Sequence, residues 1–195
     1  MSCSRRISSR WVRDKVCLAE VARNNWLVNT GEAIGITSTL SGWRINSMVP
    51  GDRVKITVAP KGFGSENKGG IKMLVPADGL EGVKKAVMEI ILHASMNPCP
   101  PMVVGIGIGG TMDRAAVMSK IALTRSINSH NPMPEYAKLE DDLLELINET
   151  GIGPQLGGTT SCLGVNIEWG PTHIAGLPVA VTICCRACRH KTRTL

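Results

Sequence analysis

The sequence predicts a mixed α/β (α+β) fold, in which a single domain is built from a mixed sheet flanked by helices. Short apolar runs bounded by glycine, proline or polar residues are typical of buried strands, and longer segments between them carry apolar residues at helical spacing. The alternation of these two patterns indicates helices layered on a sheet. A chain of 195 residues, 43% of them hydrophobic, is long enough to bury a core of its own.

The first third of the chain gives the weaker signals. Residues 1–28 are basic and form an uncertain N-terminal segment with a loose helical pattern over 11–23, whereas residues 29–195 form the predicted domain. Residues 34–45 alternate poorly and are predicted as an edge strand. Val54–Val58 alternates cleanly between apolar and polar residues, which predicts a half-buried strand.

The rest of the chain alternates between predicted helices and strands. Asp78 and Thr111 are suitable N-caps for two helices. Pro134 begins a third helix, for which Gly151 is a suitable stop. Helices are predicted at 79–94, 112–125 and from 134, strands at 102–108, 162–169 and 177–184, and glycine-rich loops at 60–70 and 152–160.

Composition argues against two classes of function. Aromatic residues make up only 3% of the chain, which does not favour a protein that stacks nucleic-acid bases on its rings. No apolar run reaches the roughly 18 residues that a membrane-spanning helix needs. We therefore expect neither a nucleic-acid nor a membrane partner. Much of the net charge of +6 gathers at the two ends of the chain, either as solvated tails or as an attraction for anionic substrates.

The chain has seven cysteines, and this content predicts both a location and a chemistry. The first residues lack the apolar segment that directs secretion. In a reducing compartment, clustered thiols bind metals or take part in catalysis more often than they form disulfides, and an odd number agrees with that. We therefore expect a cytoplasmic protein with a thiol-dependent site.

Cys99 lies in the stretch that bears most on function, Asn97–Gly110. Prolines at 98, 100 and 101 fix the backbone around this thiol before any ligand arrives. A cysteine held in this way suits a metal or cluster ligand. The plainer alternative is a buried thiol in a tight turn.

The glycine-rich segment 60–70 carries Lys61, Ser65 and Lys68. It is either a surface loop or an anion-binding loop, because glycines allow backbone N–H groups to approach a carboxylate or phosphate. The segment has no P-loop pattern. On the second interpretation, these three side chains line a site for an anionic substrate.

Three cofactor chemistries compete in this sequence. A dinucleotide fingerprint, G-x-G-x-x-G at 105–110, lacks the acidic residue that should follow about 20 residues later. The pattern formed by Cys185, Cys188 and His190 resembles half of a zinc site, without the second pair of ligands that a structural zinc normally has. The third is an iron–sulfur cluster held by distant cysteines. Three thiolates on a four-iron cluster leave one iron open as a Lewis acid.

Four long segments resemble one protein family. They are PGDRVKITVAPKGFGSENKGGIKML from residue 50, NPCPPMVVGIGIGGTMDRAAVMSKIALTR from 97, GIGPQLGGTTSCLGVNIE from 151 and PTHIAGLPVAVTICCRACRHKTRTL from 171. In this order, over residues 29–195, the chain resembles the α subunit of class I fumarate hydratase. The same family includes the α chain of L(+)-tartrate dehydratase.

The resemblance implies an oxygen-sensitive [4Fe-4S] hydro-lyase that adds water to fumarate to give L-malate. Three cysteines hold the cluster in this family, and its fourth iron binds the substrate. Cys99 matches one of these cysteines and Cys185 another, with Cys184 as the alternative to Cys185. His173 matches a histidine that looks like a contact for a substrate carboxylate, and the form of its motif, THIAGLP, favours fumarate over tartrate. A separate β subunit would complete the site, so the resemblance implies a hetero-oligomer with a small dicarboxylate substrate.

The chain also departs from the family pattern. Family members begin with a helical region bearing Cys-Gln-Asp-Thr-Gly, which supplies the first cluster cysteine and a catalytic Asp, and no such string occurs here. We therefore expect an N-terminally truncated or diverged copy. An arginine in the leading segment normally meets the substrate, and Arg13 lies near that place.

Three alternatives stay open besides fumarate hydration. They are an L(+)-tartrate dehydratase α subunit, a catalytically inactive α-like chain that only associates with a partner, and a zinc-binding module. The iron–sulfur hypothesis makes one spatial prediction. Cys99 and Cys185, far apart in the chain, should converge beside His173 in one pocket.

Overall fold

The computed structural model describes residues 35–39, 42–48, 54–154 and 158–194. The described residues form two compact units, one made of those up to Pro60 together with those from His190 on, the other of those between Lys61 and Arg189. Each unit contains a four-stranded sheet. The predicted mixed α/β class, with a mixed sheet flanked by helices, is confirmed. The predicted boundary between residues 28 and 29 and the helix predicted over 11–23 lie outside the described residues.

The smaller unit holds an antiparallel sheet. Its strands, in the order in which they pair, are β1 (Gly35–Thr39), β2 (Gly42–Met48), β3 (Val54–Pro60) and β8 (Lys191–Thr194). The single edge strand predicted over 34–45 is wrong, because β1 and β2 are two strands that pair with Thr39 opposite Gly42. The strand predicted at Val54–Val58 is confirmed as β3, which is an inner strand.

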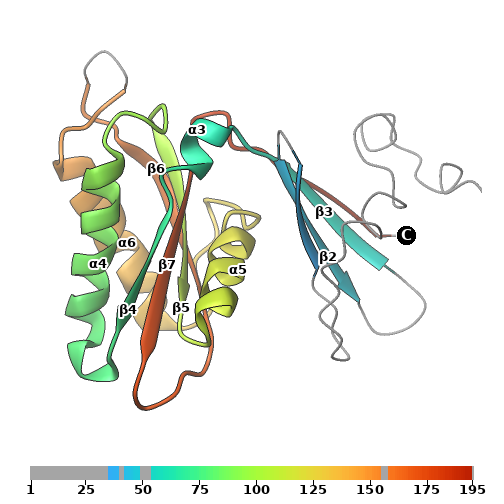
Figure 1. Ribbon diagram of the computed structural model, residues 1–195. Helices are drawn as coiled ribbons and strands as arrows, with labels where there is room; N and C mark the ends of the chain where they lie inside the picture. Colours follow the sequence, from blue (N-terminus) through green and yellow to red (C-terminus); the bar gives the residue numbers. More distant parts are fainter. Residues whose placement is uncertain (1–34, 40–41, 49–53, 155–157, 195) are drawn as a thin grey trace, which may run out of the picture. The chain divides into compact units, whose positions relative to one another are not determined.

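The larger unit has three layers. Its sheet has the order β4 (Gly70–Leu74), β7 (Leu177–Cys184), β5 (Met102–Ile108) and β6 (Cys162–Trp169). Only β5 and β6 run parallel, and the other pairs are antiparallel. Figure 1 shows α4 (Gly79–Ala94) and α6 (Pro134–Glu149) on one face of this sheet and α5 (Met112–Ala122) on the other.

The main core lies between the sheet and the pair of helices α4 and α6. Every residue of β5 is buried, and the core is built almost wholly from branched aliphatic side chains. The largest of these that are fully buried include Val87, Ile91, Leu143, Ile147, Ile167 and Ile183. Each such side chain contributes about 1.5–3 kcal/mol through its removal from water. The predicted helix 79–94 and strands 102–108, 162–169 and 177–184 are confirmed residue for residue.

On the opposite face, α5 approaches the sheet closely because β5 presents glycines to it. A Cβ atom placed on Gly107 would lie 2.0 Å from the carbonyl oxygen of Ala115, and one on Gly105 would lie 2.2 Å from that of Ser119. The Ser119 hydroxyl also makes a 2.7 Å hydrogen bond with the hydroxyl of Thr182 in β7. Helix packing therefore accounts for the first two glycines of the apparent dinucleotide fingerprint.

Several predicted boundaries need correction. The helix predicted over 112–125 ends at Ala122. Asp78 and Thr111 do occupy the N-cap positions, but neither side chain caps its helix. The predicted loop 60–70 contains a short helix, α3 (Phe63–Glu66), and is followed by β4, which was not predicted.

A buried carboxylate fixes the connection between α5 and α6. The side chain of Glu140 is 3% exposed and accepts backbone N–H hydrogen bonds from Ile167 at 2.7 Å and from Asn131 at 3.0 Å. It also pairs with the guanidinium of Arg125. One carboxylate thus ties α6 to β6 and to the loop before α6. No helix in the described part of the chain is long and apolar enough to cross a membrane.

Candidate functional site at the cysteine end of the sheet

The cysteines that the structure describes gather at one end of the larger sheet, which we call the cysteine end. Here β5 and β6 begin and β7 ends, since Val103 stands opposite Cys184 and Met102 opposite Cys162. Antiparallel pairing of β5 with β7 therefore brings the segment before β5 to the segment after β7. The described cysteines are Cys99, Cys162, Cys184, Cys185 and Cys188.

Cys99 is presented to solvent by a strained backbone. Its φ angle is 57°, a left-handed conformation that costs a residue other than glycine roughly 1–2 kcal/mol. Pro98 and Pro100 on either side are buried, whereas the thiol of Cys99 is exposed. The Cys99 carbonyl accepts a 3.3 Å hydrogen bond from the backbone N–H of Arg186. The alternative of a buried thiol is therefore wrong, and Cys99 lies beside the turn that follows β7.

That turn carries the other cysteines of the C-terminal motif. The N–H of Cys188 donates to the carbonyl of Cys185 at 2.8 Å, which closes the turn. A hydrogen bond with Cys188, together with burial, raises the pKa of the Cys184 thiol, and the same bond lowers the pKa of Cys188. Cys184 is 3% exposed, whereas Cys185 is only half-buried. Of the two adjacent cysteines, Cys185 is thus the more accessible to solvent. It directly precedes Arg186, whose N–H group makes the hydrogen bond to Cys99.

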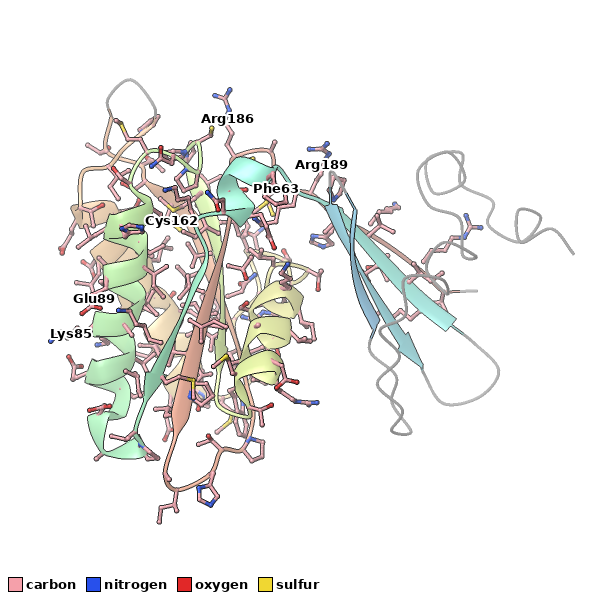
Figure 2. The ribbon with its side chains drawn as sticks, viewed as in Figure 1. Phe63, Lys85, Glu89, Cys162, Arg186 and Arg189 are labelled. Atoms are coloured by element: carbon pink, nitrogen blue, oxygen red, sulfur yellow. The ribbon has the colours of Figure 1, made fainter. Side chains whose placement is uncertain are left out.

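Cys162 belongs to the core rather than to the open part of this end. Its side chain is 2% exposed and packs with the aliphatic residues between the sheet and the helices. Burial raises the pKa of its thiol to about 12. A thiol in this environment stays protonated and unreactive. Figure 2 shows Cys162, together with Arg186 and Phe63 at the cysteine end.

A buried lysine lies at the same end of the sheet. The side chain of Lys61 is 2% exposed, and its ammonium nitrogen lies 2.9 Å from Glu66 Oε2 and donates to Ser65 Oγ at 3.3 Å. The other oxygen of Glu66 pairs with Lys120 of α5. Burial lowers the pKa of Lys61 by more than Glu66 raises it. Burial raises the pKa of Glu66, but hydrogen bonds from Lys120 and Lys61 outweigh this effect and lower it.

The three residues predicted to line an anion-binding loop thus have different environments. Lys61 is engaged with Glu66, and Ser65 is buried and donates its hydroxyl to the carbonyl of Gly62 at 2.9 Å. Lys68 is half-buried, and within the described ranges it pairs with no carboxylate. The end of this loop segment packs against β7 three residues before Cys184, because a Cβ on Gly69 would lie 2.8 Å from the carbonyl oxygen of Val181. Substrate contacts by these side chains stay predictions.

His173 lies at the opposite end of the sheet. It sits in the exposed loop before β7, where the carbonyl of Pro171 accepts the N–H of Gly110, the second residue after β5. The eight residues of β7 separate this loop from Cys185, a span of roughly 25 Å at about 3.3 Å per residue. The predicted convergence of both cysteines with His173 is therefore not observed within one chain. The sequence already contained the evidence against this convergence, because His173 and Cys185 lie on either side of the strand predicted at 177–184.

Two further predictions concern metal binding and substrate binding. Cys185 and Cys188 share a turn, but across residues 54–154 and 158–194 no three His, Cys, Asp or Glu side chains are arranged to hold a metal ion. The zinc interpretation of Cys185, Cys188 and His190 stays a prediction, because His190 belongs to the other compact unit. Arg13, the predicted arginine contact, lies outside the described residues.

The cysteine end nevertheless suits an iron–sulfur cluster in its chemistry. Exposed Cys99 and half-buried Cys185 come from neighbouring segments and offer the thiolates that such clusters require. Two lysines, Lys61 and Lys120, share one carboxylate beside them, and this excess of positive charge suits a group of net negative charge. The structure does not identify which residue would supply a third thiolate.

Sequence comparison decides the family. A family model for fumarate hydratase (Fumerase) matches residues 26–194. This chain belongs to that family. A putative L(+)-tartrate dehydratase subunit alpha of Methanocaldococcus jannaschii is 48% identical over 143 residues, which cover 73% of this chain and 50% of the relative. An L(+)-tartrate dehydratase subunit alpha of Escherichia coli is 42% identical over 167 residues, which cover 85% of this chain and 54% of the relative.

Family membership confirms the resemblance drawn from the four sequence segments. The family is one of hydro-lyases, and the two relatives are named as alpha subunits. This chain spans about half the length of the curated relatives that it matches.

Proposed function

We propose that this chain is the α-type component of a [4Fe-4S] hydro-lyase that interconverts fumarate and L-malate by addition and elimination of water. The observation that supports this most is the pairing of β5 with β7, which brings the segments of Cys99 and Cys185 together at one end of the sheet. Family membership supplies the reaction class.

In this proposal, Cys99 and Cys185 hold the cluster as thiolates, and the structure does not identify the residue that supplies the third ligand. When bound, the cluster supplies an open iron that acts as a Lewis acid toward the hydroxyl group of the substrate. The backbone of Cys99, held left-handed between buried prolines, keeps its thiol aimed at the site before the cluster arrives. Because the backbone of Cys99 is already fixed, less conformational entropy is lost when the cluster binds.

The remaining residues of the proposed site act on the substrate. Lys68, half-buried beside the cysteine end, attracts the carboxylates of the substrate. His173 and Arg13 stay predicted contacts for a substrate carboxylate. Because His173 lies at the far end of β7, it would contact a substrate in a different site from the one that Cys99 and Cys185 of the same chain form. The group that moves the proton is expected from a β subunit, because the relatives are named as alpha subunits. The cytoplasmic location stays a prediction.

The test uses the full chain, reconstituted with iron and sulfide under anaerobic conditions, alone and with a β subunit. We expect bound iron and sulfide in equal amounts, and malate dehydration, followed by the ultraviolet absorbance of fumarate, only with β present. Cys99→Ser and Cys185→Ser should each lose most of the iron. Cys162→Ala is the matched control, because its thiol is buried in the core. A chain that binds no iron with β present, or equal iron loss in the control, contradicts the proposal.

L(+)-tartrate is the second candidate substrate. The names of the relatives favour it, since both are L(+)-tartrate dehydratase alpha subunits, one of them putative. Elimination of water from tartrate gives oxaloacetate, so the same reconstituted protein can be assayed with both substrates. The substrate with the higher kcat/KM is the one assigned.

A catalytically inactive chain is the third candidate. It is favoured by the observation that, across the described residues, no three His, Cys, Asp or Glu side chains are arranged to hold a metal ion. Co-purification with a β subunit, with neither iron nor turnover, would support this candidate. Measurable malate or tartrate dehydration would exclude it.

A further inference from the structure

The buried ion pairs at the cysteine end carry more positive than negative charge. Lys61 and Lys120 both pair with the single carboxylate of Glu66, and their side chains are 2%, 20% and 28% exposed, respectively. Among the described residues no second carboxylate pairs with either lysine. Because an unbalanced buried charge is costly, this arrangement indicates an anionic neighbour.

The excess charge faces the cysteines. Lys61 lies within Coulombic range of the thiols of both Cys184 and Cys188. The segment after α3 packs against β7 two residues before Cys184, since a Cβ on Gly69 would lie 3.7 Å from Cα of Thr182. The ammonium of Lys61 is shielded from solvent at this end of the sheet.

We propose that Lys61 is a positioning residue that supplies the counter-charge for a negatively charged, thiolate-bound iron–sulfur cluster at the cysteine end. This inference rests on the proposed function and deepens it. Glu66 and Lys120 hold Lys61 in place, so that Lys61 acts on the cluster by its field rather than on the substrate by contact. Its burial explains why it is unsuited to the substrate contact predicted from the sequence.

A fixed positive charge affects the two oxidation states of a cluster differently. Reduction adds one negative charge to the cluster, so a nearby ammonium stabilises the reduced form more than the oxidised form. Net charge around a cluster is one of the factors that set its reduction potential. Removal of the charge at Lys61 should therefore make the potential more negative. Replacement of a residue that only anchors α3 would not make the reduction potential of the cluster more negative.

The test measures the midpoint potential of the reconstituted full chain and the rate at which it loses iron in air. Lys61→Met should lower the potential and speed iron loss, and Lys61→Arg should restore both toward wild type. Lys120→Met breaks a pair with the same carboxylate, yet it should shift the potential less, because the Lys120 side chain is 20% exposed and solvent screens its charge more than that of Lys61. Lys84→Met is the control, since Lys84 pairs with Glu81 and Asp142 on the helical face and should leave the potential unchanged.

The outcomes separate this inference from the proposed function. If the wild-type chain takes up neither iron nor sulfide, both are overturned. If it binds a cluster and Lys61→Met leaves the potential unchanged, or Lys120→Met shifts it equally, only the role of Lys61 is overturned. Should Lys61→Met fail to fold by circular dichroism, Lys61→Gln replaces it, because an amide can still bond to Ser65 and Glu66 without a charge.

Discussion

Replacement of Gly107 by alanine tests whether the glycines of β5 serve helix packing. The added Cβ would lie 2.0 Å from the carbonyl oxygen of Ala115 and 2.7 Å from the backbone nitrogen of Ser119, both on α5. Neither is a flexible side-chain atom, so the helix itself has to move. Restoring an ordinary contact of 3.4 Å requires α5 to withdraw from the sheet.

The cost of this withdrawal can be built from its parts. Overpacking of a close-packed interface costs about 1–3 kcal/mol. Loss of the buried hydrogen bond between Ser119 and Thr182 adds about 1 kcal/mol. The substitution also stabilises the folded state by about 0.4–1 kcal/mol, because alanine lowers the conformational entropy of the unfolded chain relative to glycine. We expect Gly107→Ala to lower the free energy of unfolding by about 1–3.5 kcal/mol.

Urea unfolding of the full chain, followed by circular dichroism, measures this change. Gly62→Ala is the matched control, because a Cβ there meets nothing within 4 Å and its φ of −71° suits alanine. We expect the control to change stability by no more than about 0.5 kcal/mol. If the two variants are equally stable, the close approach of α5 to Gly107 is wrong.

Three further predictions concern buried and exposed polar groups. Burial raises the pKa of the Cys162 thiol from 9.0 to about 12, so stability should fall as pH rises between these values. Cys162→Ala should lessen this fall of the urea midpoint without abolishing it, because the pKa of the Cys184 thiol is raised as well. Iodoacetamide should label exposed Cys99 but not Cys162 in the native protein, as read by peptide mass spectrometry; equal labelling would contradict the described burial. Glu140→Gln removes the buried charge that pairs with Arg125, which keeps its contact with Glu168, and should cost about 1.5–3 kcal/mol in the same urea assay, whereas no measurable loss would show that the carboxylate is not buried.

Periodicity predicted the elements that bury a stripe of apolar side chains. α4 and β5 were located to the residue because their apolar spacing is unambiguous. β4 was missed because its three central residues are exposed and carry no alternation. β8 was missed because all its residues are exposed, and it exists only through pairing with β3. Short edge strands of this kind depend on a neighbour that local sequence does not identify.

The site was predictable only in part, and for a related reason. Cys99 and Cys185 could be matched to a family, but their proximity results from the pairing of β5 with β7. The burial of Lys61 was not foreseen, because lysine is almost always exposed unless it is paired. Glu66, which pairs with Lys61, also pairs with Lys120, and Glu66 and Lys120 lie 54 positions apart in the sequence. No local sequence pattern connects them. The predicted convergence of His173 with the cysteines was wrong within one chain, although the strand predicted between His173 and Cys185 already argued against it.

The two strands that carry the proposed ligands are the inner strands of the larger sheet, with β4 and β6 outside them. Backbone amides in such central ladders exchange with solvent only when the whole structure opens. Widening the gap between the start of β5 and the end of β7 therefore requires cooperative unfolding rather than local fraying. The two segments that hold the proposed ligands therefore keep their spacing for as long as the sheet persists, and loss of a cluster from the folded protein would report on the chemistry of the cluster rather than on separation of the strands.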